Sequence, residues 1–243
     1  MTYCLAMRLN EGLVFLADTR TNAGVDDINT FRKLHVVQPA EDRLFVIASA
    51  GSLAATHEVL DRVARDLAAE APESLATVNH LFEAALYLGR LLREVSAEHR
   101  DALAAVGADG AATFILGGQI EGERPDLLLV YPEGNYIRVS DERPFLQIGE
   151  SKYGKFLLEL AVAEHVALPA AAKIALTSMI MTARANLSVG PPYDLGVYRN
   201  GALALDEVRV EADAPFLAEL EAVWARHLTA AIEDLPPAPA RVP

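Results

Sequence analysis

The chain has 243 residues, of which 52% are hydrophobic and 23% are charged, which is typical of a globular protein that buries a substantial core. Its net charge of −13 disfavours binding to nucleic acid, because an acidic surface repels phosphates and no basic cluster offsets it. Cys4 is the only cysteine and the six histidines show no HExxH or H-x-H spacing, so an internal disulfide is excluded and we expect no metal site.

The first fifty residues predict two β-hairpins, because short apolar strands alternate there with turn residues. A polar, turn-rich stretch between the hairpins, residues 19–30, predicts a loop. The predicted strands cover residues 3–9, 13–18, 33–39 and 43–51.

From Ser52 to about Leu103, apolar residues recur at spacings of three and four, with charged residues on the opposite side. This pattern predicts two long amphipathic helices, over residues 53–71 and 75–103, separated by Pro72 and Ser74.

The second half of the chain repeats this order of strands followed by helices. The predicted strands cover residues 111–118, 126–131, 135–140, 145–148 and 205–211, and residues 193–203 predict a further strand with an Asn-Gly turn. The predicted helices cover residues 151–166, 170–186 and 214–233, and a proline-rich tail starts at about residue 235. Because strands do not alternate singly with helices, we predict one α+β domain over residues 1–243, with two stacked antiparallel sheets and a pair of helices outside each.

The opening "MTYCLAMRL" predicts a strand that starts almost at the first residue, and it has neither a basic leader nor a signal-peptide core. No apolar run approaches the roughly 18–20 residues that span a bilayer, so we expect a cytoplasmic protein without membrane contact. If Met1 is removed, Thr2 carries a hydroxyl nucleophile and a free α-amine whose ordinary pKa is about 7.7–8.0. Such an amine can serve as the base that a weak alcohol nucleophile needs.

Four further segments accompany this Thr, in order along the chain: "LADTRTNAG", "FRKL", "ASAGSLA" and "GESKYGK". Together with "MTYC", they make the sequence resemble the active β-subunits of the proteasome. The resemblance is closest to Anbu, a bacterial proteasome-like family, and extends from residue 2 to about residue 210. It implies the N-terminal-nucleophile hydrolase fold, a four-layer αββα sandwich.

The resemblance also implies roles for individual residues. Thr2 would be the nucleophile and, through its amine, the base, while Lys33 lowers the pKa of both groups and Asp18 orients Lys33. The backbone N–H of Gly51 would stabilise the oxyanion, and Arg20 would brace the loop beside Asp18.

Two supporting positions match the family less closely. A serine that follows a glycine at the start of the third helix corresponds to Ser151 or to Glu150, and we favour Ser151. A later Asp-x-x-Ser corresponds to Asn186 and Ser188 at a spacing one residue shorter, and Asn186 lacks the charge of the aspartate.

The resemblance places four residues in the wall of the substrate pocket, namely Thr21, Phe31, Ser49 and Leu53. A pocket of this composition would suit a small or modest apolar side chain.

Cys4 lies two residues beyond Thr2 and therefore on the same face of the strand, so a thiol nucleophile with His35 as its base is an alternative. A small buried apolar residue is the simpler interpretation of Cys4. On the last predicted helix, Phe216 and Trp224 are interpreted as core residues or as contacts between subunits.

We therefore expect a threonine peptidase that acts on peptides or proteins without metal or organic cofactor and forms a homo-oligomer, either ring-like or helical. Alternatives are an inactive structural or peptide-binding subunit, and an amidase for a small peptide-like substrate. The sequence shows no docking motif for an ATPase, and no ATPase or operon partner is assigned.

Overall fold

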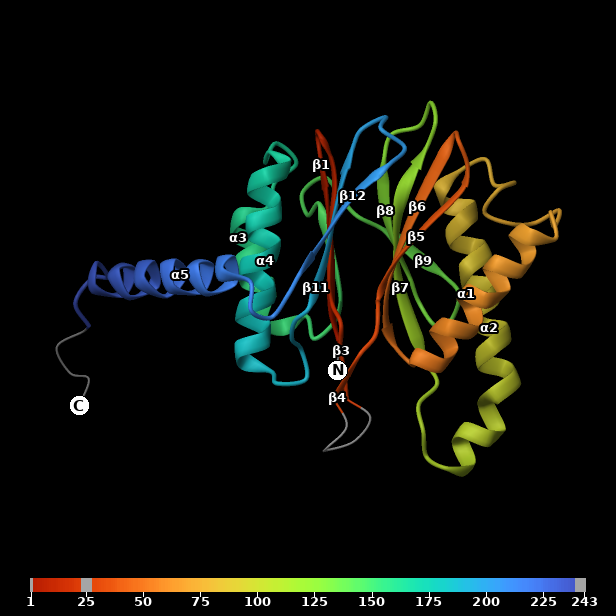
Figure 1. The fold of residues 1–243 in the computed structure, drawn as a ribbon, viewed down its shortest axis with the longest axis horizontal. Helices are drawn as coiled ribbons and strands as arrows, with labels where there is room; N and C mark the ends of the chain where they lie inside the picture. Colours follow the sequence, from red (N-terminus) through yellow and green to blue (C-terminus); the bar gives the residue numbers. More distant parts are fainter. Residues whose placement is uncertain (1, 23–27, 239–243) are drawn as a thin grey trace.

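The computed structural model describes residues 2–22 and 28–238 and forms a four-layer sandwich (Figure 1). Two five-stranded sheets lie face to face, with order β10-β1-β2-β11-β12 in one and β5-β6-β7-β8-β9 in the other. Helices α1 and α2 cover the second sheet, and α3 and α4 cover the first. The expected αββα architecture is thereby confirmed.

All strand pairs in both sheets are antiparallel. The strands are β1 (Tyr3–Leu9), β2 (Gly12–Asp18), β3 (Arg20–Asn22), β4 (Ile28–Thr30), β5 (Leu34–Ala40), β6 (Arg43–Gly51), β7 (Ala112–Ile120), β8 (Asp126–Val130), β9 (Tyr136–Arg138), β10 (Phe145–Gly149), β11 (Tyr193–Arg199) and β12 (Leu205–Val210). The helices are α1 (Leu53–Ala68), α2 (Leu81–Ala105), α3 (Lys152–Ala161), α4 (Leu168–Ala185) and α5 (Pro215–Glu233).

Three apolar clusters fill the spaces between the four layers. One joins α1 and α2 to the second sheet, one lies between the two sheets, and one joins the first sheet to α3, α4 and the start of α5. Every residue of β1 and β2 is buried, because both faces of these strands are covered. The start of β1, next to Thr2, is therefore fixed by the core on both sides.

The expected elements differ most from the structure in three places. The predicted loop at residues 19–30 contains β3 and β4, which pair with each other and form no part of either sheet. Helix α2 begins at Leu81 and not at residue 75, because the Glu83 carboxylate accepts hydrogen bonds from the N–H groups of Asn79 (2.7 Å) and His80 (3.3 Å) and so ends the preceding turns. Helix α3 ends at Ala161, five residues before the expected end.

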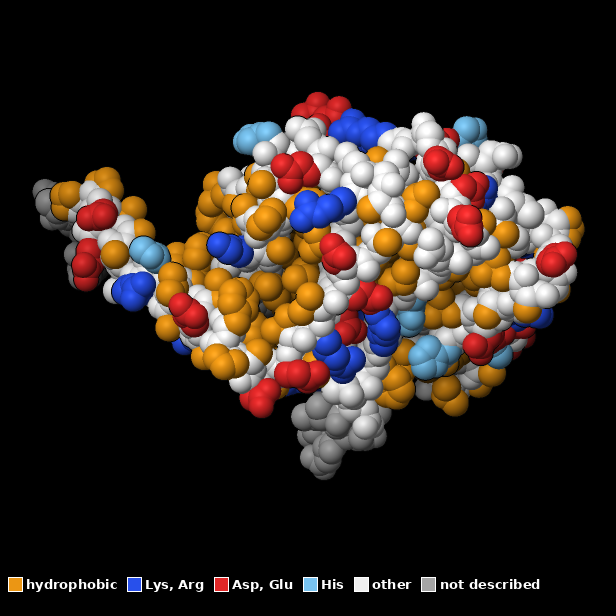
Figure 2. All heavy atoms as spheres, turned by 45° about the horizontal axis from the view of Figure 1, so that its top comes forward, with side chains coloured by type: hydrophobic (Ala, Val, Ile, Leu, Met, Phe, Trp, Pro, Cys, Tyr) orange, Lys and Arg blue, Asp and Glu red, His pale blue; other side chains and the backbone are white. Residues whose placement is uncertain are grey.

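Helix α5 projects from the body of the molecule and stands clear of the sandwich (Figures 1 and 2). Leu217, near its start, is buried, whereas Phe216 is 44% exposed and Ile232, near its end, is 67% exposed. Phe216 is thus not a core residue of this chain, and Trp224 is only partly buried.

Candidate active site

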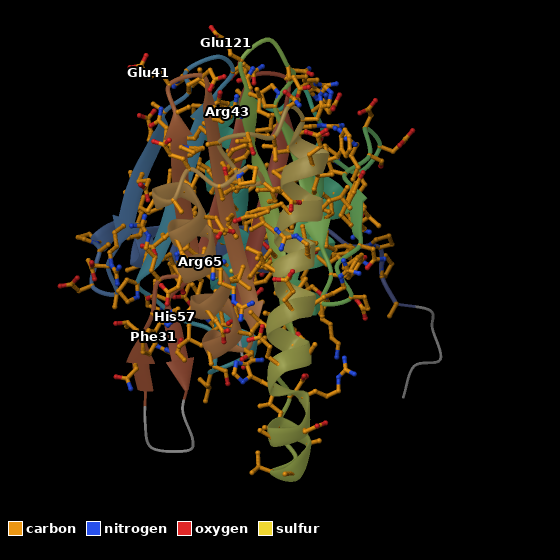
Figure 3. The ribbon with its side chains drawn as sticks, turned by 90° about the vertical axis from the view of Figure 1, so that its right-hand side faces the viewer. Phe31, Glu41, Arg43, His57, Arg65 and Glu121 are labelled. Atoms are coloured by element: carbon orange, nitrogen blue, oxygen red, sulfur yellow. The ribbon has the colours of Figure 1, made fainter. Side chains whose placement is uncertain are left out.

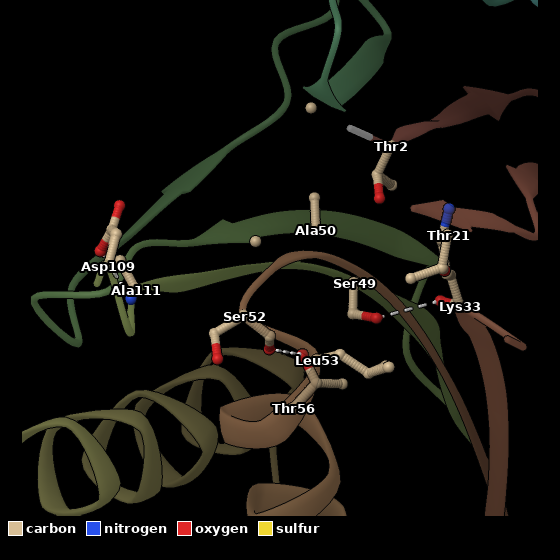
Figure 4. A pocket seen from close by; sticks show the side chains of 12 residues that line it. Thr2, Thr21, Lys33, Ser49, Ala50, Ser52, Leu53, Thr56, Asp109 and Ala111 are labelled. Carbon is tan, nitrogen blue, oxygen red and sulfur yellow. Dashed lines mark hydrogen bonds between the residues drawn. The ribbon is translucent and has the colours of Figure 1, made fainter. Parts of the chain in front are cut away.

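A cavity of about 470 Å³ opens where β1 begins and β6 ends, beside the first turn of α1 (Figure 4). Thr2, Thr21 and Lys33 lie on one side of it, and Asp109 and Ala111 lie on the other. The remaining lining residues come from the end of β6, the start of α1 and the end of β10: Ser49, Ala50, Gly51, Ser52, Leu53, Thr56 and Gly149. The cavity therefore brings together residues from both sheets.

A buried ion pair lies directly beneath Thr2. The Lys33 Nζ atom is 2.8 Å from Asp18 Oδ1 and 2.6 Å from the Arg20 carbonyl oxygen, and the side chains of Lys33 and Asp18 are 5% and 0% exposed. Asp18 Oδ1 also accepts a hydrogen bond, at 3.0 Å, from the N–H of Tyr3, which is the residue that follows Thr2. The carboxylate thus fixes both the lysine and the backbone that carries Thr2.

Burial raises the pKa of the Asp18 carboxyl, and the positive charge of Lys33 opposes that increase. The second carboxylate oxygen, Oδ2, accepts a hydrogen bond from the N–H of Gly190 at 3.3 Å. Hydrogen-bond donors on both oxygens, together with Lys33, favour the ionised form of Asp18 and oppose the effect of burial.

The backbone of Thr2 is held from the other side by the end of β10. The N–H of Glu150 donates to the Thr2 carbonyl at 2.7 Å, and Gly149 (φ +79°) packs so closely that a Cβ atom there would lie 1.9 Å from the same carbonyl oxygen. Only glycine fits this close approach at positive φ. The "IGE" segment is therefore a backbone clamp on Thr2.

Gly51 lies at the junction of β6 and α1, where the expected oxyanion donor would be. Its φ is +103°, and an added Cβ would lie 2.3 Å from the Ala111 carbonyl oxygen. The following residue, Ser52, caps α1 by accepting a hydrogen bond from the N–H of Ala55 at 3.2 Å. The partial positive charge of the α1 N-terminus is thereby directed toward the cavity.

Three of the four expected pocket residues, Thr21, Ser49 and Leu53, line the cavity. Phe31 does not: it is 37% exposed, and its ring packs near His57 with centroids 6.1 Å apart (Figure 3). Its place in the wall was inferred from the family pattern alone, and the chain after β4 turns its side chain outward.

Six polar or small residues that line the cavity were missed from the sequence: Ala50, Ser52, Thr56, Asp109, Ala111 and Gly149. Asp109 and Ala111 belong to the turn before β7 and approach Gly51 only because β6 and β7 pair at Gly51 and Ala112. No local sequence signal marks this turn as part of a site, although Asp109-Gly110 is a typical turn pair.

The supporting residues form a second group beside Thr2. Asn186 Nδ2 donates to Glu150 Oε2 at 3.0 Å, and Asn186 Oδ1 accepts from the N–H of Ser188 at 2.9 Å. Ser151, at the start of α3, instead lines a separate cavity between α3 and β8–β10. Hydrogen bonding therefore favours Glu150 over Ser151 as the partner of Asn186.

Arg20 braces the segment that follows α4. Its Nη1 atom donates to the Leu187 carbonyl oxygen at 2.8 Å, and its guanidinium packs against Gly190, where an added Cβ would lie 2.3 Å from Arg20 Cζ. This contact holds in place the Gly190 N–H that binds Asp18.

Cys4 is fully buried, and its Sγ atom lies 3.5 Å from the Ser49 carbonyl oxygen. Burial strongly raises the pKa of the thiol, so a thiolate is disfavoured. Burial also lowers the pKa of His35 to about 4, and no hydrogen bond joins it to Cys4 among the described residues. The geometry supports the interpretation of Cys4 as a packing residue.

One surface group has the composition of a metal site: the side chains of Glu58, Glu98 and His99, on α1 and α2. The guanidinium of Arg62 lies within 2.6 Å of both carboxylates, and His99 Nε2 is 2.8 Å from Glu58. An arginine already neutralises these acids, so the group is better described as a surface ion-pair network.

Comparison with protein-family models gives no match, and no curated protein matches the chain.

In the described part of the chain, no helix has the length and apolar content to cross a membrane.

Solved structures, in contrast, match closely. Anbu from Hyphomicrobium sp. strain MC1 is 41% identical, with a TM-score of 0.88 over 98% of this chain and 100% of that one. Anbu, described as an ancestral beta-subunit, from Yersinia bercovieri is 38% identical, with a TM-score of 0.91 over 99% and 100%. The subunit of the helical assembly of the Anbu complex from Pseudomonas aeruginosa is 39% identical, with a TM-score of 0.91 over the full length of both chains. Identity at this level over the whole length, together with the motifs and the αββα fold, shows that the chain belongs to the Anbu family of proteasome-like proteins.

Proposed function

We propose that this protein is a threonine peptidase, with Thr2 exposed as the N-terminal residue after removal of Met1. One observation carries the proposal: the buried Lys33–Asp18 pair binds the Tyr3 N–H, and both Lys33 and Thr2 line the cavity. A lysine is almost never buried unless it is paired, as Lys33 is with Asp18, and Thr2 in the wall of the same cavity can supply nucleophile and base together.

In the proposed reaction, the Thr2 amine accepts the proton of Thr2 Oγ as that oxygen attacks a peptide carbonyl. The charge of Lys33 lowers the pKa of the hydroxyl and of the amine, which makes the alkoxide less costly and leaves more of the amine unprotonated. The developing oxyanion is stabilised by the Gly51 N–H at the N-terminus of α1.

Collapse of the tetrahedral intermediate breaks the peptide C–N bond, and the leaving amine takes the proton from the Thr2 ammonium. The acyl group remains as an ester on Thr2 Oγ. The Thr2 amine then takes a proton from water as the water oxygen attacks the ester. Collapse of this second tetrahedral intermediate breaks the ester C–O bond, and the Thr2 ammonium returns the proton to Oγ, which releases the acid and the free enzyme.

A small or modest apolar side chain of the substrate would enter the wall formed by Thr21, Ser49 and Leu53. Asp109 gives the opposite side of the cavity a negative charge, which favours a substrate that is neutral or basic on that side. The helical assembly of the Pseudomonas aeruginosa relative supports a homo-oligomer for this chain as well.

The test combines intact mass with a covalent probe. The mass of the purified protein is expected to lack one Met, and a β-lactone or epoxyketone is expected to label Thr2. Labelling should be lost in Thr2→Ala and strongly reduced in Lys33→Ala, whereas Lys173→Ala, an exposed lysine on α4, should label as the wild type does.

Full retention of Met1 would refute the proposal, because an acylated Thr2 nitrogen cannot act as a base. That result would favour a structural or peptide-binding subunit. Labelling of Thr2 without turnover of any peptide would instead favour an amidase for a dedicated small substrate.

A further inference from the structure

Glu150 is an acidic residue that is only 8% exposed and lies beside Thr2. The hydrogen bond to its carboxylate comes from a neutral amide, Asn186 Nδ2, at 3.0 Å. Among the described residues, no lysine, arginine or histidine forms an ion pair with it. A buried carboxylate without a counter-charge is costly. The positive charge that would stabilise Glu150 must therefore come from a group other than a lysine, arginine or histidine side chain.

The strand register shows where such a cation would lie. In the β1–β10 ladder, Tyr3 lies opposite Gly149 and Cys4 opposite Ile148, so Thr2 lies opposite Glu150. The Glu150 N–H donates to the Thr2 carbonyl at 2.7 Å. In an antiparallel ladder the N–H and C=O of one residue point to the same neighbouring strand, so the nitrogen of Thr2 faces the main chain of Glu150, the residue that carries this buried carboxylate.

The segment after α4 encloses this end of β1. Asn186 holds the Glu150 carboxylate on the β10 side, and the N–H of Gly190 reaches Asp18 on the β2 side at 3.3 Å. Residues 186–190 therefore connect Glu150, which follows β10, to Asp18 at the end of β2, on the two strands that flank β1.

We propose that Glu150 is a positioning residue whose carboxylate is the counter-ion of the Thr2 α-ammonium, formed when Met1 is removed, and that Asn186 orients this carboxylate. The inference rests on the proposed function, since it assigns the acid that sets the protonation of the catalytic amine. Lys33 lowers the pKa of the amine and Glu150 raises it, so the two charges together place the base near neutral pH.

Other charged groups around Thr2 are already engaged or lie elsewhere. Asp18 is paired with Lys33, the Arg20 guanidinium donates to the Leu187 carbonyl oxygen, Asp109 lies across the cavity, and Lys152 at the start of α3 is exposed. Burial raises the pKa of the Tyr3 phenol to about 12, so it stays neutral over the working range.

The test measures the pKa of the Thr2 amine without depending on turnover. The purified oligomer is acetylated with trace acetic anhydride from pH 5 to pH 10, in competition with a free threonine-initiated peptide, and the N-terminal peptide is quantified by mass spectrometry. Glu150→Gln keeps the shape and a hydrogen bond to Asn186 but removes the charge, so the amine pKa should fall by about one unit or more.

Two further variants separate charge from structure. Glu133→Gln, at an exposed turn, should leave the amine pKa at the wild-type value. The double variant Glu150→Gln/Asn186→Asp returns the negative charge from the other side of the same hydrogen bond, and it should restore the higher pKa. It also serves if Glu150→Gln alone folds poorly, because a failure to restore the amine pKa in the folded double variant refutes the inference.

An unchanged amine pKa in a folded Glu150→Gln variant overturns the inference while leaving the peptidase proposal intact. The expected pKa pattern without any labelling of Thr2 by the lactone supports the counter-ion and refutes the peptidase. Retention of Met1 overturns both.

Discussion

Replacement of Lys33 by methionine tests whether the ion pair below Thr2 behaves as a buried charge pair. The variant removes the ammonium 2.8 Å from Asp18 but keeps an apolar stem of similar length. Asp18 is 0% exposed and retains hydrogen bonds from the N–H groups of Tyr3 and Gly190. Breaking a buried pair by removing one partner costs about 3–5 kcal/mol, and the two remaining donors place the expected loss near the lower end, at about 3 kcal/mol.

The loss should depend on pH with a definite sign. Burial already raises the pKa of Asp18, and without Lys33 the folded-state pKa rises further. The folded variant then holds a proton that the unfolded chain releases above about pH 4, so its stability falls as the pH rises toward the folded-state pKa. The deficit relative to wild type should therefore be smaller at pH 5 than at pH 8.

Urea unfolding followed by far-UV circular dichroism, at one protein concentration, measures this deficit at both pH values. Lys173→Met provides the control for loss of an exposed lysine, and Asp18→Asn/Lys33→Met should recover part of the loss because no charge remains buried. A Lys33→Met variant within about 1 kcal/mol of wild type at pH 8, or a deficit equal at both pH values, would refute the reasoning.

Three other predictions concern the surroundings of Thr2. Gly149→Ala places a Cβ 1.9 Å from the Thr2 carbonyl oxygen at positive φ, so the displaced Thr2 should react with a β-lactone about 100-fold more slowly; an unchanged rate would contradict the clamp. Tyr3→Phe removes a buried hydroxyl 2.8 Å from Ser178 Oγ and should lower the free energy of unfolding by about 1–3 kcal/mol in urea, whereas equal stability would show that this bond contributes nothing. Cys4 should react with iodoacetamide only after unfolding, as judged by peptide mass spectrometry, because burial raises its pKa; rapid alkylation of the native protein would reopen the thiol alternative.

The arrangement of layers could be predicted from the sequence because apolar periodicity records which faces are buried, and the long amphipathic helices and short strands leave few ways to stack. The order of Thr2, Asp18, Lys33 and Gly51 along the chain also places them near one another, since each lies at the end of a predicted strand. Their catalytic roles stay predictions.

What the sequence did not show depends on contacts between distant segments. Strands β3 and β4 are built from polar residues whose composition predicts a loop, and they pair only with each other, outside the two five-stranded sheets. The Asn186–Glu150 hydrogen bond joins residues 36 positions apart, one directly after α4 and the other directly after β10. The motif alone could not choose between Glu150 and Ser151. Asp109 reaches the cavity only through the β6–β7 register.

The cavity draws Thr2 and Gly149 from one sheet and Lys33, Ser49 and Gly51 from the edge and end of the other. Neither sheet alone contains a nucleophile and its ammonium neighbour, so the site comes into existence only when the two sheets dock. We therefore expect the reaction of Thr2 with a lactone to report, during refolding, when the two sheets have docked. During refolding, reactivity should lag behind the recovery of secondary structure and appear together with burial of the apolar layer between the sheets.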